Sequence, residues 1–128
     1  MIEQFQEAYW VEGHIWTTNS ERRMHWADRA KCVRYLRQAA FVVGKEKGVK
    51  FDVPVDIIVE PIQRSKTAAD ADAFHPAVKA IIDGFVDAKV IENDSPKFLK
   101  SIKYLSPKVG TVSGVKVWIS YERGTDEA

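Results

Sequence analysis

The residues best suited to chemistry lie between positions 70 and 94. Asp70 and Asp72 stand two apart in a polar segment, and Asp94 follows in a turn after a stretch of helical periodicity. In an extended segment the side chains at i and i+2 point to the same side, so we expect both carboxylates of the pair to face one site. Asp94 joins them if the chain doubles back. Three carboxylates with open positions suit an Mg²⁺ ion that also binds a phosphate.

A lysine lies within reach of this acidic segment. Lys79 and Asp83 are four apart on the polar face of the helix expected between the acidic blocks. An ammonium group there would counter the negative charge that develops when a phosphodiester is attacked. A purely structural interpretation is also open at this point, in which Asp70 and Asp72 are a solvated helix cap and Lys79 and Asp83 a surface ion pair.

Hydrophobic periodicity indicates the elements that must position these residues. Apolar and polar residues alternate in four expected strands, which are Tyr9–Trp16, Val53–Ile62, Phe98–Leu105 and Val115–Tyr121. Apolar residues recur every three or four positions in two expected helices, from Met24 to about Lys47 and from Pro76 to about Lys89. We therefore expect an α+β fold in which two main helices pack against one small mixed sheet, largely antiparallel.

The connections carry further expectations. Asn19 or Ser20 is expected to cap the first helix, and His75 is expected to lie outside the second helix because Pro76 follows it. A short strand at Val90–Ile91 would let the chain double back. We expect the last two strands to form a hairpin through 107–114, and 63–73 to be an exposed loop.

Composition limits the class of protein. A chain of 128 residues with 45% apolar and 29% charged residues fits one globular domain, 1–128, with an ordered core of about 5–122. It does not fit a disordered chain or a disulfide-framed miniprotein. Cys32 is the single cysteine, and the first ten residues do not fit a secretory signal. No apolar run is long enough to cross a bilayer, so we expect no membrane contact and a cytoplasmic location.

Charge is segregated along the chain although the total is only +1. Positions 22–37 hold six basic residues and one acidic residue, and 97–116 hold five lysines and no acidic residue. Between these basic segments, 51–94 holds four basic and nine acidic residues. Two basic segments around an acidic centre suit a protein that binds a polyanion together with metal cations. Two solvated faces that happen to sum to neutrality are an equally good interpretation of charge alone.

Three separated blocks follow one another in a family-like order. The densest part runs from Asp70-Ala71-Asp72, through Lys79-Ala80-Ile81-Ile82-Asp83-Gly84-Phe85-Val86-Asp87-Ala88, to Asn93-Asp94-Ser95. Upstream stand Asn19-Ser20 and Arg23-Met24-His25-Trp26, followed by Arg29. Over about Asn19 to Ile119 the chain resembles the RusA family of Holliday junction resolvases.

The resemblance implies a homodimeric endonuclease that resolves four-way DNA junctions by paired symmetric nicks. It implies Mg²⁺ as cofactor, with Mn²⁺ as a substitute, in the cytoplasm of a bacterial or phage-infected cell. By position, Asp70, Asp72 and Asp94 match the family's catalytic, metal-binding aspartates, and Lys79 matches its essential lysine. Charge and resemblance together nominate contacts to branched DNA at Asn19, Arg23, His25, Arg29, Arg34, Lys97, Lys100 and Lys103.

Two departures from the family pattern define the alternatives. Ala73 stands where many relatives have asparagine, and Asn93 where many have a further aspartate. These changes favour a catalytically weak or inactive branched-DNA-binding protein of the same fold. A nuclease for other branched DNA would use the same site on a different substrate.

The tryptophans and the downstream lysines complete the expectations. Trp10, Trp16, Trp26 and Trp118 could stack on unpaired bases, but their places in strands and a helix favour core packing for most of them. Lys97, Lys100 and Lys103 recur every third residue, so in a strand they would not share one face. They suit diffuse attraction of phosphates better than specific contacts.

Overall fold

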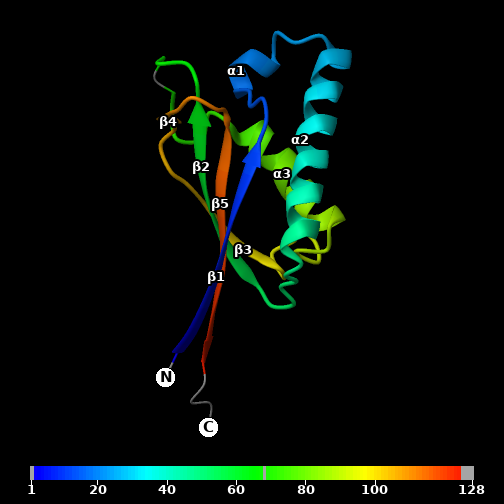
Figure 1. The fold of residues 1–128 in the computed structure, drawn as a ribbon, viewed down its shortest axis with the longest axis vertical. Helices are drawn as coiled ribbons and strands as arrows, with labels where there is room; N and C mark the ends of the chain where they lie inside the picture. The colour runs from blue at the N-terminus through cyan, green and yellow to red at the C-terminus, as the bar shows by residue number, and fades with distance from the viewer. Residues whose placement is uncertain (1, 68, 125–128) are drawn as a thin grey trace.

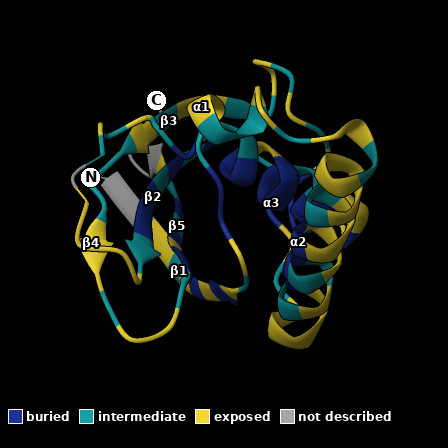
Figure 2. Cartoon of the chain, turned by 90° about the horizontal axis from the view of Figure 1, so that it is seen from above, coloured by how far each residue is buried: buried dark blue, intermediate teal, exposed yellow. Residues whose placement is uncertain are grey.

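The computed structural model describes residues 2–67 and 69–124. Two main helices cover one face of a twisted sheet, and its other face carries no helix of the described chain (Figures 1 and 2). In chain order the elements are β1 (Ile2–Glu12), α1 (Thr18–Glu21), α2 (Trp26–Lys47), β2 (Val55–Gln63), α3 (His75–Asp87), β3 (Leu99–Tyr104), β4 (Lys108–Val109) and β5 (Gly114–Gly124).

The sheet is mixed, with the strand order β1-β5-β2-β3 and the short β4 also paired to β2. The long β1 and β5 are antiparallel over their whole length, and β5 is antiparallel to β2. By contrast, β2 runs parallel to β3 and β4. Parallel neighbours need a crossover connection, and α3 supplies it between β2 and β3. The expected α+β class, with a largely antiparallel sheet and two main helices, is confirmed.

The expected hairpin between the last two strands is wrong. β2 lies between β3 and β5, so the two strands do not touch as neighbours. Alternating apolar residues show that a segment is a strand but do not say which strand lies beside it. The 107–114 connection instead carries β4, which pairs with the end of β2 through Ile62↔Lys108.

The first strand begins earlier than expected and ends at Glu12, so Tyr9–Trp16 is only partly strand. Its limits follow from its partner, because β5 begins at Gly114, opposite Glu12. The last link is the N–H of Gly13, which donates to the carbonyl of Ser113. Beyond it the chain leaves the sheet.

The helix starts also differ from expectation. Thr17 caps the separate α1, where its side chain accepts from the Ser20 N–H and the Ser20 hydroxyl oxygen accepts from the Thr17 N–H. His25 caps α2, with Nδ1 accepting from the Ala27 N–H at 3.2 Å. Neither Asn19 nor Ser20 therefore caps the main helix. His75 lies inside α3, because its N–H donates to the Asp72 carbonyl and a preceding turn runs directly into the helix.

The core lies between the sheet and the two main helices. Alternate residues of β2 and β5 are buried toward the helices, as are Tyr9 and Val11 of β1. The apolar stripe expected on the second helix is buried at Val78, Ile81, Ile82 and Phe85. The ring centroid of Phe85 lies 5.0 Å from that of Tyr9, which joins α3 to the sheet.

α2 and α3 approach each other closely at a glycine. A Cβ atom added at Gly84 would lie 2.7 Å from the Ala40 Cβ and closer still to the Arg37 carbonyl oxygen. Arg37 also forms a bidentate ion pair with Asp87, in which Nε lies 2.6 Å from Oδ2 and Nη2 lies 2.9 Å from Oδ1. The missing side chain at Gly84 thus lets the two backbones meet.

We expect Gly84→Ala to destabilise the fold. The added methyl group meets backbone that cannot move aside, and such overpacking costs about 1–3 kcal/mol. Urea unfolding measures the loss. Gly44→Ala is the matched control, because it gives the same gain in helix propensity but meets side-chain atoms of Val90 and Ala88, and we expect a smaller loss. A Gly84→Ala protein as stable as the wild type would contradict the close approach.

Candidate active site

Lys79 is the centre of a cluster of charges on the outer face of α3. Its Nζ lies 3.0 Å from Oδ1 of Asp83 and 2.5 Å from Oδ2 of Asp94. Asp83 follows one helical turn later, whereas Asp94 comes from the segment after the helix. The structure thus brings together two residues from separate sequence blocks, Lys79 and Asp94.

The return of the chain toward α3 explains how Asp94 reaches Lys79. After α3 the chain makes an isolated parallel bridge between Ile91 and Phe51, at the place where a short strand was expected. A turn follows, in which the Asn93 side-chain oxygen accepts from the Ser95 N–H at 2.8 Å. This side-chain contact fixes the turn. Asn93 therefore has a structural role beside Asp94.

The ion pairs hold Lys79 in its charged form. Hydrogen bonds to Asp94 and then to Asp83 raise the pKa of the Lys79 ammonium. The same contact from Lys79 lowers the pKa of the Asp94 carboxyl. A lysine with a raised pKa does not serve as a general base near neutral pH. It suits the stabilisation of negative charge.

Asp70 and Asp72 do not lie in an extended segment, so the argument that they face one site is wrong. The Ala73 N–H donates to the Asp70 carbonyl at 3.0 Å, and the His75 N–H donates to the Asp72 carbonyl at 3.1 Å. These bonds make a turn that leads into α3, and alternation of side chains applies only to extended backbone.

The two aspartates consequently have different surroundings. Asp70 lines a cleft beside α1. Asp72 lies near Tyr104 at the end of β3, where burial and then the negative charge of Asp72 raise the pKa of the Tyr104 hydroxyl. That hydroxyl lies 2.8 Å from Nδ1 of His75.

The donor types suit Mg²⁺, but their arrangement does not form one site. Within residues 2–67 and 69–124, no three histidine, cysteine, aspartate or glutamate side chains are grouped so as to hold a metal ion. Asp94 is paired with Lys79, and Asp70 lines a cleft whose lining does not include Asp72. The three aspartates therefore do not fit a common ion as this single chain places them.

The cleft lined by Asp70 has a volume of about 810 Å³ and lies where β1 and β2 end and β5 begins. Asn19 and Ser20 of α1 line it together with Asp70 and Arg64. The Thr18 N–H donates to the Ala73 carbonyl at 2.9 Å, so α1 is joined directly to the acidic turn. Sequence reasoning nominated Asn19 and Asp70 but missed the cleft, because its walls come from three separate segments, which are 14–20, 63–74 and Ser113.

A second groove, of about 360 Å³, places α2 beside the charge cluster. Arg29 of α2 lines it together with Lys79, Asp83 and His75. This groove was missed as well, although Arg29 and Lys79 were each nominated. The sequence showed Arg29 and Lys79 only on the faces of two separate helices. How those two faces lie relative to each other depends on helix packing.

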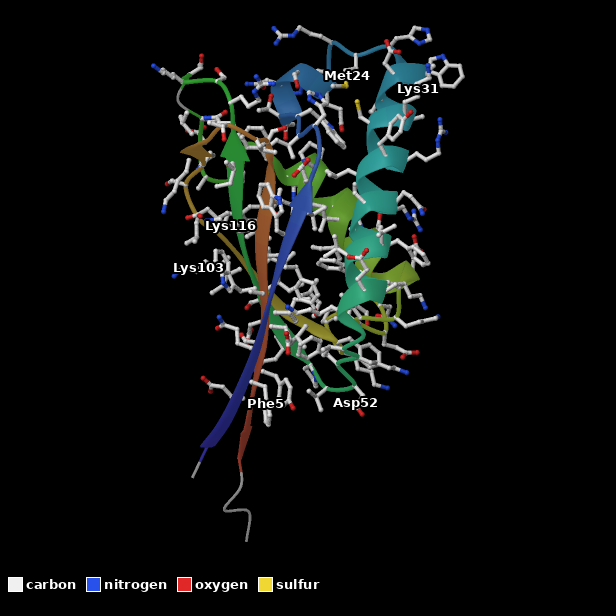
Figure 3. All side chains as sticks on the ribbon, in the orientation of Figure 1. Phe5, Met24, Lys31, Asp52, Lys103 and Lys116 are labelled. Carbon is white, nitrogen blue, oxygen red and sulfur yellow. The ribbon has the colours of Figure 1, made fainter. Side chains whose placement is uncertain are left out.

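The two basic segments do not meet on one surface. Arg23, His25, Arg29 and Arg34 are exposed at the start of α2 or just before it. In Figure 3, Lys31 of α2 lies on the helical side, whereas Lys103 and Lys116 lie on the opposite side.

The register of β3 explains the placement of the downstream lysines. Ile102 packs against the core, so the next residue, Lys103, points away from it. Lys100 falls at a register shift of β3, and Lys97 extends its ammonium over the Phe98 ring. The later Lys108 and Lys116 reach the buried Glu60, at 3.1 and 4.0 Å, so this basic segment is partly neutralised within the chain.

Only one of the four tryptophans is buried, so core packing is the wrong interpretation for most of them: Trp118 is half-buried and Trp10 is 37% exposed. Trp16 is 2% exposed, as expected, and its indole N–H donates to Glu21 at 2.8 Å. Trp26 is 73% exposed, so core packing is the wrong interpretation for it. The reason is the length of α2. Arg29 and Val33 line a groove together with the start of α3. Trp26 lies about one turn before Arg29, where α2 extends past α3 (Figure 1).

Comparison with known proteins assigns no family to this chain. The sequence matches no protein-family model, and a search of curated proteins finds no significant match. The resemblance to RusA-family resolvases therefore rests on the three sequence blocks. Within the described residues, no helix combines the length and the apolar character required to cross a membrane.

We expect Lys79→Met to raise the pKa of Asp94 toward that of an ordinary aspartate, as followed by NMR titration of side-chain carboxyl carbons. Because the folded-state pKa is depressed, the pair stabilises the fold above the unfolded pKa, and this stability is lost as the pH falls through the folded value. The pair is half-exposed, so its contribution is at most about 1 kcal/mol.

The control for this titration is the separate pair of Arg37 with Asp87, in which the Arg37 hydrogen bond lowers the pKa of Asp87. Arg37→Met should raise the pKa of Asp87 and leave that of Asp94 unchanged. An Asp94 titration that is insensitive to Lys79→Met would show that the two side chains are not paired in solution.

Proposed function

We propose that this chain is an endonuclease of the RusA type that cuts branched DNA, with the four-way junction as its principal substrate. One observation carries the proposal: Lys79 and Asp94, which stand in two separate sequence blocks, form an ion pair in the fold. The hydrogen bond from the Thr18 N–H to the Ala73 carbonyl also holds the upstream residues Asn19-Ser20 beside the turn that carries Asp70 and Asp72.

The proposed reaction is hydrolysis of a phosphodiester. The oxygen of a water attacks phosphorus and gives up a proton to solvent, while negative charge grows on the phosphate oxygens. The bond from phosphorus to the leaving oxygen breaks, its electron pair stays on that oxygen, and the oxygen takes a proton from solvent. The Lys79 ammonium counters that charge, and Asp83 positions it. Arg29, across the groove, holds a neighbouring phosphate.

Mg²⁺, with Mn²⁺ as a substitute, is part of the proposal because the nominated ligands are carboxylates. Asp94 has to give up its contact with Lys79 to serve as such a ligand. A homodimer is also part of it, since two symmetric nicks need two symmetric sites. The single cysteine fits a reducing compartment, and we place the protein in the cytoplasm.

A second candidate is a branched-DNA-binding protein without catalysis. The engagement of Asp94 by Lys79 and the structural use of the Asn93 side chain favour it, as does Ala73 in the acidic turn. A nuclease for flaps or other branched DNA is the remaining alternative. It would differ from the first proposal in substrate preference alone.

The test is cleavage of a labelled synthetic four-way junction by the full chain. We expect paired symmetric nicks in Mg²⁺ or Mn²⁺ and none after chelation. Lys79→Met, Asp72→Asn and Asp94→Asn should each slow cleavage by about 100-fold or more. The matched controls are Asp52→Asn and Lys50→Met, which remove a carboxylate and a lysine at exposed positions outside the site. Both variants should cut the junction like the wild type.

Each alternative outcome has a distinct meaning. Junction binding that persists in Mg²⁺ without nicking supports the non-catalytic protein. Faster cutting of flaps than of four-way junctions supports the other nuclease. Cleavage that is equally fast in the wild type and in Asp72→Asn and Asp94→Asn removes the proposed site.

A further inference from the structure

We propose that Trp26, together with Arg29 and Arg34, is a platform on which an unpaired base of branched DNA stacks. The inference rests on the proposed function for its ligand class, which is single-stranded nucleotides that adjoin a duplex. It adds a binding site outside the acidic turn and the charge cluster around Lys79.

The first argument is the exposure of a large aromatic ring. Trp26 is 73% exposed although burial of such a ring is strongly favourable. Its one aromatic neighbour among the described residues is His25, with ring centroids 5.5 Å apart and ring planes tilted by 32°. The His25 ring is itself held as the cap of α2. The indole therefore stands on a rigid base.

The second argument is the frame of cations around that ring. Trp26 lines a groove of about 520 Å³ together with Arg29, Arg34 and the small or apolar side chains of Ala30 and Val33. Arg37 at the far end is already paired with Asp87. Within residues 2–67 and 69–124, neither Arg29 nor Arg34 forms an ion pair. An aromatic surface flanked by free guanidinium groups is what binds bases and phosphates of a single strand.

The third argument is continuity with the candidate active site. Arg29 lines both the groove of Trp26 and the groove of Lys79. A strand with a phosphate at Lys79 would therefore pass Arg29 and reach Trp26 on the same side of the molecule. An unpaired base at a branch point is free to stack there, whereas the bases of an intact duplex are already stacked.

The charge of this surface favours DNA over a second copy of this chain as its binding partner. The segment 22–37 carries a net charge of +5, with six basic residues and one acidic residue. Two such faces packed together across a twofold axis would repel each other. A polyanion neutralises them instead.

Tyr35 provides a matched control on the same helix. It is 77% exposed, slightly more than Trp26. It lies nine residues further along, which turns it by about 180° around the helix. Tyr35 accordingly lines a different pocket with Glu12, His14 and Leu36, on the side of β1.

The experiment measures binding of the full chain to a labelled four-way junction with unpaired thymines at the crossover, and to a linear duplex of equal length. Trp26→Ala should weaken junction binding by about 10-fold or more and leave duplex binding nearly unchanged. Trp26→Phe should retain most of the affinity, because the stacking surface remains. Tyr35→Ala should bind both DNAs like the wild type. Oligothymidine should quench tryptophan fluorescence of the wild type, and Trp26→Phe should lose that quenching.

Several results would overturn the platform. One is junction binding by Trp26→Ala that equals binding by the wild type. If the wild type also cuts the junction, this result leaves the proposed function intact. Equal losses on junction and duplex, or equal effects of Trp26→Ala and Tyr35→Ala, also overturn it. A change of oligomeric state in Trp26→Ala would assign the ring to a contact between copies. A wild type that binds no DNA overturns the platform and the proposed function together.

Discussion

The close contact of α2 with α3 is the constraint on which the candidate site depends. Because Gly84 has no side chain, its backbone meets the backbone of Arg37 and the methyl group of Ala40. That contact sets the register of the two helices along each other. It brings Arg29 to the groove that holds Lys79, and it leaves Trp26 beyond the start of α3. A buried glycine thus determines which charges and which ring face a ligand, although it touches none of them.

The same region shows why a charge cluster has two physical interpretations. Lys79 balances Asp83 and Asp94 in the single chain, which is a sufficient reason for these residues to be present. Under the proposed function, a phosphate approaching Lys79 would compete with Asp94 for the ammonium, and the released carboxylate would become a free ligand. An ion pair of this kind is half-exposed, so breaking it costs little. A surface pair is therefore compatible with a site that rearranges when substrate arrives.

Much of the architecture could be predicted from local pattern. The buried stripe of α3, the strand at β2 and the return of the chain near Ile91 follow from periodicity and turn residues, because side-chain burial repeats with backbone geometry. The false hairpin marks the limit of such reasoning. Alternation reports that β3 and β5 are strands, but the choice of neighbour depends on the crossover through α3. Likewise, the i, i+2 argument for Asp70 and Asp72 assumed extended backbone, whereas hydrogen bonds to Ala73 and His75 make a turn.

The sequence alone determined the chemical inventory of this protein: the aspartates, the lysine, the basic segment before and within α2, and the α+β class that periodicity implies. Tertiary structure decided which of these meet. It paired Lys79 with Asp94, placed Asp70 and Asp72 on a turn, placed Lys103 on the face away from α2, and left Trp26 in solvent. The physical reason is that periodicity is a property of one element, whereas proximity is a property of packed elements. Packing depends on a few close contacts, such as the one at Gly84, that no local pattern encodes.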